Sequence, residues 1–114
     1  MKTESLVCGL TPEAIEELKR KYPSVHMLCA DPDGEARLEI IVRKPGRADY
    51  SRFLKDAPKN TYAAMRQMVM DCRLAPDPDA VAAMFEENPG LVTTFGDKVA
   101  ALAKGGIECT EKKL

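Results

Sequence analysis

The stretch VHMLCADPDGEARLEIIVR, residues 25–43, decides the fold class of this chain. It opens and closes with short runs that are rich in apolar and β-branched residues, and its middle is Asp31-Pro32-Asp33-Gly34-Glu35. Proline fixes φ and glycine tolerates a positive φ, so this cluster is typical of a turn between two strands. The stretch therefore predicts a β-hairpin with strands at residues 25–30 and 36–43.

The second of these strands alternates between apolar and charged side chains. We expect one face of the hairpin to meet a hydrophobic core through Leu38, Ile40 and Val42. On the other face Ile41 stands among charged residues, which predicts that it is partly covered. Because a two-stranded hairpin is marginal in water, it must pack on helices or extend a sheet with another copy, and we expect some self-association for this reason.

Upstream of the hairpin the sequence predicts one helix. Thr11-Pro12-Glu13 is a typical helix start, with Thr as the N-cap and Pro in the first turn. Ile15, Leu18 and Tyr22 follow at helical spacing. Pro23 ends the segment, because the residue before a proline is disfavoured in the α region.

Downstream of Pro45-Gly46 the apolar residues recur with a period near 3.6 and predict four further helices. Their apolar stripes are, in order, Tyr50, Phe53, Leu54 and Ala57; Tyr62, Met65, Met68, Val69 and Cys72; Val81, Met84 and Phe85; and Leu91, Val92, Phe95, Val99 and Leu102. The prediction is an α+β fold with an N-terminal helix and a β-hairpin packed on a mostly helical body of about four helices. Its core should include Phe53, Leu54, Val69 and Phe95.

Length and charge limit the classes of protein. The 114 residues suit a single domain over residues 1–114, with residues 1–10 and 107–114 expected to be flexible. Seventeen Lys and Arg against eighteen Asp and Glu leave no cationic excess for a nucleic-acid partner. No apolar run approaches the roughly 20 residues that span a bilayer, so we expect no membrane partner and a cytoplasmic location.

No residue pattern in the chain predicts catalysis. His26 has no ligand or catalytic partner at a suitable spacing, and the four cysteines contain no C-x-x-C pair. We expect reduced cysteines, with Cys29 and Cys72 buried as small hydrophobes. Asp31–Glu35 lacks the remaining ligands of a calcium loop. The prediction is a non-enzymatic protein with no catalytic residue, no metal site and no cofactor.

Two features predict a protein-binding surface on the helical layer at residues 60–104. One is a basic segment that would steer an acidic stretch of a partner, and the other is a group of methionines, whose flexible side chains adapt to varied surfaces. The candidate partner-binding residues are Arg43, Lys44, Arg47, Met68, Met70 and Met84.

The order of several short motifs resembles a known family. The motifs are Ile40-Ile41-Val42-Arg43-Lys44-Pro45, a helix with Tyr50 and Phe53, a long helix ending at Leu74-Ala75-Pro76-Asp77, and Asn88-Pro89-Gly90-Leu91 opening the last helix. In this order, over roughly residues 25–105, the chain resembles the tail assembly chaperones of long-tailed bacteriophages and related prophages.

The resemblance implies a non-enzymatic protein of the host-cell cytoplasm. Such chaperones hold the long, helical tape measure protein soluble and help to recruit the tail tube protein during assembly, and some are also made in a longer, frameshifted form. Two alternatives stay open on the sequence. One is a small adaptor or regulatory domain that binds a peptide or a small molecule, and the other is an enzyme subunit whose catalytic groups lie on another chain.

Overall fold

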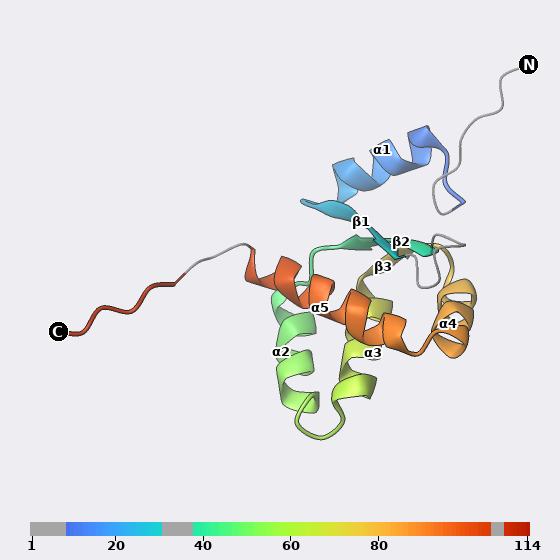
Figure 1. Cartoon of the computed structure of the whole chain (residues 1–114). Helices are drawn as coiled ribbons and strands as arrows, with labels where there is room; N and C mark the ends of the chain where they lie inside the picture. Colours follow the sequence, from blue (N-terminus) through green and yellow to red (C-terminus); the bar gives the residue numbers. More distant parts are fainter. Residues whose placement is uncertain (1–8, 31–37, 106–108) are drawn as a thin grey trace, which may run out of the picture.

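A computed structural model describes residues 9–30, 38–105 and 109–114 of the chain. Within these residues the elements are α1 (Pro12–Lys21), β1 (Val25–Ala30), β2 (Leu38–Arg43), α2 (Arg47–Asp56), α3 (Thr61–Cys72), β3 (Arg73–Ala75), α4 (Pro78–Glu87) and α5 (Gly90–Lys104) (Figure 1). The α+β prediction is confirmed, including the order of an N-terminal helix, a hairpin and four helices. The predicted turn at residues 31–35 lies outside the described residues.

The sheet has one strand more than the sequence predicted. β1 and β2 pair antiparallel, with Leu28 opposite Ile40. β3 follows α3 directly and pairs antiparallel with the other side of β2, so that the strand order is β1-β2-β3. A two-stranded hairpin was therefore an incomplete prediction. Residues 73–75 are too few to show a period of two, and their pairing with β2 makes them a strand.

Local capping explains where three of the helices begin. The Thr11 side chain accepts a hydrogen bond from the Ala14 N–H at 3.2 Å and opens α1. Asn60 does the same for α3 and Asp77 for α4, at 3.0 and 2.9 Å. These side chains satisfy N–H groups that have no partner inside the helix, and the cap predicted at Thr11 is confirmed.

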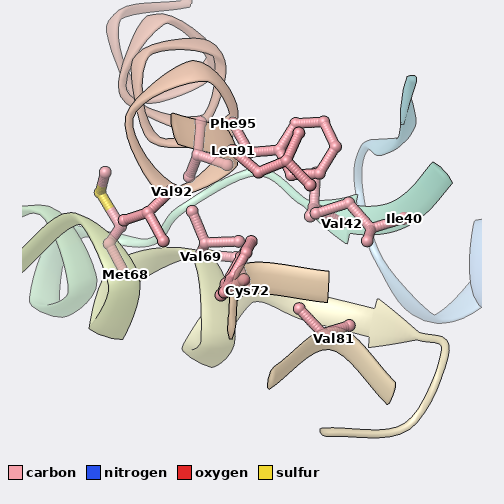
Figure 2. Close-up of a cluster of buried hydrophobic side chains, with 11 residues drawn as sticks. Ile40, Val42, Met68, Val69, Cys72, Val81, Leu91, Val92 and Phe95 are labelled. Atoms are coloured by element: carbon pink, nitrogen blue, oxygen red, sulfur yellow. The ribbon is translucent and has the colours of Figure 1, made fainter. Parts of the chain in front are cut away.

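The hydrophobic core lies between one face of the sheet and the helices α3, α4 and α5. Figure 2 shows Ile40 and Val42 of β2 directed toward Phe95 of α5. Phe95 is 1% exposed, which confirms its predicted place in the core. The buried cluster consists of Ile40, Val42, Met68, Val69, Cys72, Val81, Phe85, Leu91, Val92, Phe95 and Val99.

A glycine sets the close approach of α3 and α5. A Cβ atom at Gly96 would lie 3.0 Å from the Cβ of Met65 and 3.1 Å from its sulfur. Carbon atoms at their optimal separation stand about 3.5–4.0 Å apart. The two helices can therefore pack at this spacing because residue 96 has no side chain.

The opposite face of the sheet is covered more sparsely. α1 lies on that side (Figure 1), and none of its residues is buried. Ile41 of β2 is only 3% exposed, so the prediction that it is covered is confirmed. Its cross-strand partner on β1, Met27, is 48% exposed. On this face the side chain of Ile41 on β2 is therefore buried, while that of Met27 on β1 is exposed to solvent.

Two of the residues predicted to be buried are exposed, and two others, Leu38 and Phe53, are only partly buried. Leu54 is 55% exposed, because α2 packs mainly on α3 and no second layer covers the rest of its apolar stripe. Cys29 is exposed while Cys72 is buried as predicted. Cys29 alternates with Leu28 along β1 and so shares the open face with Met27. Residues 109–114 are exposed and have no regular secondary structure.

Candidate protein-binding surface

Arg43, the first predicted steering cation, is engaged inside the molecule. Its Nη1 donates to Asp49 Oδ2 at 2.8 Å and its Nη2 to the carbonyl oxygen of Asp71 at 3.1 Å. The hydrogen bond with Asp49 raises the pKa of Arg43 and lowers that of the Asp49 carboxyl group. Arg43 therefore connects the end of β2 to α2 and α3, and its role as a partner contact stays a prediction.

Lys44 lies against another element of the fold, whereas Arg47 is exposed to solvent. The Lys44 Nζ atom lies 3.4 Å from the place that a Cβ on Gly105 would take, at the carboxyl end of α5. Helix carboxyl ends carry partial negative charge and favour a cation there. Arg47 is exposed in the first turn of α2 and remains available to a partner.

The methionines contribute more to packing than the sequence predicted. Met68 is 2% exposed and belongs to the core, so it presents no surface to a partner and its prediction is wrong. Met70 and Met84 are partly buried and pack against the core cluster. These two keep some exposed surface, and they stay candidate contacts.

Besides Met27 of β1 and the terminal Leu114, two large apolar side chains of the described residues are exposed, and both lie near the turn between α2 and α3. Leu54, two residues before the end of α2, is 55% exposed, and Tyr62, the second residue of α3, is 42% exposed. Lys55 and Lys59 beside them are exposed as well. α2 and α3, with the turn between them, form a helical hairpin. We call Leu54, Lys55, Lys59 and Tyr62 the hairpin surface. The sequence signal that could have revealed it is the pair Lys55 and Lys59, which follow Leu54 and lie on either side of Pro58.

Charge is distributed unevenly over the helical body. Residues 47–66 hold five Lys or Arg and two Asp, a formal excess of three positive charges. Residues 77–97 hold five Asp or Glu and no Lys or Arg. A chain that is almost neutral as a whole therefore has a basic hairpin and an acidic region at α4 and the first half of α5.

Depressions occur at several places on the described surface, including one of about 300 Å³ between α1 and Leu74 of β3. Another, of about 470 Å³, lies where α4 meets α5 and is lined by residues that include Glu87, Pro89 and Leu91. Two adjoining depressions of about 390 and 300 Å³ share Ser24 and Lys44 as lining residues. We call the adjoining pair the Ser24 cleft.

The chemistry of these depressions is limited. In the Ser24 cleft the Ser24 hydroxyl contacts His26 Nε2.

Outside these depressions, burial raises the pKa of the Cys72 thiol to about 11, so this thiol is protonated at neutral pH and is a poor nucleophile. In residues 9–30, 38–105 and 109–114 no cluster of three His, Cys, Asp or Glu side chains is arranged to hold a metal ion. None of the helices in the described part of the chain is long and apolar enough to cross a bilayer.

Comparison with protein families gives a match over most of the chain. Residues 16–110 match the family model described as "Domain of unknown function (DUF6848)". The chain belongs to this family. The family description assigns no activity to its members, and it leaves the likeness to tail assembly chaperones as a proposal. No curated protein sequence matches the chain.

One solved structure shares the fold. It is the structure of an uncharacterised protein from Bacillus stearothermophilus, which is 24% identical in sequence and superposes with a TM-score of 0.72. The match covers 87% of this chain and 99% of the other. At this level of identity the likeness concerns the fold alone. It indicates that the arrangement of sheet and helices forms a unit that another protein also uses.

Proposed function

We propose that the chain is a non-enzymatic tail assembly chaperone that binds a helical segment of a tape measure protein. The observation that supports this function best is the hairpin surface, where Leu54 and Tyr62 are exposed on two helices beside two lysines. Large apolar side chains gathered at one place on a surface are typical of protein-binding sites. The proposal moves the centre of the binding surface from the methionines to this hairpin.

The hairpin surface suits an amphipathic helix as its partner. Such a helix presents apolar side chains at positions i, i+3, i+4 and i+7, and it binds where a shallow apolar surface covers them. Leu54 supplies an aliphatic contact, and Tyr62 supplies an aromatic ring with a polar hydroxyl group, a combination common at interfaces. Covering the partner's apolar stripe opposes its aggregation in proportion to the area removed from water, so no nucleotide is needed.

The charges favour a partner segment with acidic residues along its flank. Arg47, Lys55 and Lys59 are exposed in α2 and the turn that follows it. Charges at the rim of an interface mainly raise the association rate and fix orientation. In this proposal Arg47, Lys55 and Lys59 take the steering role, while Arg43 and Lys44 support the fold. Met70 and Met84 provide adaptable contacts at the edge of the same helical layer.

Co-expression tests the proposal. The chain is produced together with the long helical protein encoded beside its own gene, and the soluble fraction of that protein is measured. We expect the chain to raise this fraction severalfold and the pair Leu54→Glu with Tyr62→Glu to abolish the gain. A matched control is Ala83→Glu with Thr93→Glu, because these side chains are also exposed on helices and the charge change is equal. A partner that is equally insoluble with and without the chain would refute the chaperone function.

A second function, an adaptor domain that binds a peptide or small molecule, is favoured by the Ser24 cleft. Its combined walls bring Ser24, His26 and Lys44 together beside apolar side chains, and ligand sites typically combine apolar walls with a few polar groups in cavities of about 300–1,000 Å³. This function predicts that a carboxylate-bearing peptide shifts the amide NMR signals of Ser24 and Lys44. The chaperone proposal predicts instead that a partner helix shifts those of Leu54 and Tyr62.

A further inference from the structure

Two surfaces of opposite charge face away from the core at different parts of the molecule. The turn of the α2–α3 hairpin projects on one side, and α4 lies on another (Figure 1). We call Glu86 and Glu87, together with the depression of about 470 Å³ that Glu87 helps to line, the acidic corner. Both carboxylates are exposed, and no Lys or Arg occurs between residues 77 and 97.

The two surfaces are also complementary in shape and polarity. The hairpin surface protrudes and carries the exposed Leu54, whereas the acidic corner is hollowed and has Leu91 and Pro89 in its lining. A single molecule cannot bring the two together, because α3 passes from the hairpin turn straight into the core through Met68 and Val69. A surface that fits the hairpin of this chain is thus present on a second copy of the same chain.

We propose that copies of this chain associate head to tail, with the hairpin surface of one copy docked on the acidic corner of the next. Leu54 enters the depression between α4 and α5, and Lys55 and Lys59 face Glu86 and Glu87. The two contacting patches differ, so the interface is heterologous and continues from copy to copy into a ring or a short filament. This assembly does not depend on a tape measure partner.

The interface differs from pairing at a sheet edge. The described sheet has the order β1-β2-β3, so its edges are β1 and the three-residue strand β3. Edge pairing would use backbone groups and would respond weakly to salt. Contacts between exposed charges are screened over about 10 Å at 0.1 M salt, so head-to-tail docking weakens as salt is added.

Sedimentation velocity of the full chain tests the proposal, at micromolar to near-millimolar concentration and at low and high salt. We expect concentration-dependent assembly that weakens at high salt, and a roughly tenfold or greater loss of affinity for Lys55→Glu with Lys59→Glu. The double variant Glu86→Lys with Glu87→Lys should lose self-association affinity to the same extent. Lys112→Glu with Lys113→Glu is the matched control, since these lysines are exposed in the C-terminal residues and undergo the same charge change.

Mixing the two charge-reversed variants gives the decisive result. Each variant alone has like charges on both surfaces and should stay monomeric, whereas in the mixture each hairpin meets a corner of opposite sign and assembly should return. Circular dichroism shows whether each variant is folded. A strictly monomeric wild-type chain would overturn the proposal. Assembly unaffected by either reversal, or a mixture that stays monomeric, would overturn it as well.

Discussion

The two faces of the sheet differ sharply in how deeply they are buried. On the inner face Ile40 and Val42 are 0% exposed beneath α3 and α5, whereas α1 on the outer face has no buried residue and Met27 there is 48% exposed. Both faces are nevertheless covered by helices with an apolar stripe. An apolar stripe thus shows which side of a helix turns inward, while the depth of burial depends on the number of layers around it.

The largest expected effect tests the inner face. Phe95→Ala should lower the free energy of unfolding by about 3–5 kcal/mol, because Phe95 is buried and the change leaves a cavity. The urea midpoint at constant slope measures this loss. Tyr62→Ala is a suitable control, since this exposed ring should contribute only about 0.5 kcal/mol. An unchanged midpoint for Phe95→Ala would show that the core has been wrongly assigned.

A second test concerns the contact between α3 and α5 on the same face. Gly96→Ala should destabilise by about 1–2 kcal/mol, because the new Cβ meets Met65 at 3.0 Å and overpacking outweighs the gain in helix propensity. Gly90→Ala is the control, since a Cβ there meets nothing within 4 Å. Adding Met65→Gly, which removes the Cβ at 3.0 Å as well as the Cγ and sulfur atoms, should remove most of the Gly96→Ala effect in a double-mutant cycle. If the two substitutions are instead additive, the helices do not approach at Gly96.

The third test moves to the rim of the sheet, where Asp49 pairs with Arg43. Asp49→Asn should lower stability by about 1 kcal/mol at pH 7, since the pair is only partly buried. The pKa of Asp49 is lower in the folded than in the unfolded state, so its contribution is complete above the unfolded value near 3.9 and disappears as pH falls through the folded value. Wild type and variant should therefore converge in acid. Asp97→Asn, at an exposed position of α5, is the control.

The smallest effect belongs to the outer face. Leu18→Ala in α1 should lower the free energy of unfolding by about 0.5 kcal/mol, because Leu18 is only partly covered. Amide hydrogen exchange should show α1 opening at a much lower free energy than α5. Amides of α1 that exchange as slowly as those of α5 would show that both faces of the sheet are equally stable.

Local chemistry made most of the fold predictable. The helix starts at Thr11, Asn60 and Asp77 and the alternation in β2 are all encoded within a few residues. β3 escaped prediction because its strand state depends on pairing with β2, which is distant in sequence. The binding surface was harder still. The exposure of Leu54 depends on whether a second layer covers α2, and a sequence of 10 helical residues does not show this.

The direct passage from α3 into β3 has a mechanical consequence. α3 ends at Cys72 and β3 begins at Arg73, so no linker separates this helix from the sheet. Arg43 binds Asp49 of α2 and the backbone of Asp71 at the end of α3, which fixes both legs of the hairpin to β2. A force applied to the turn between α2 and α3 by a bound partner would therefore be transmitted through these contacts to β2 and β3.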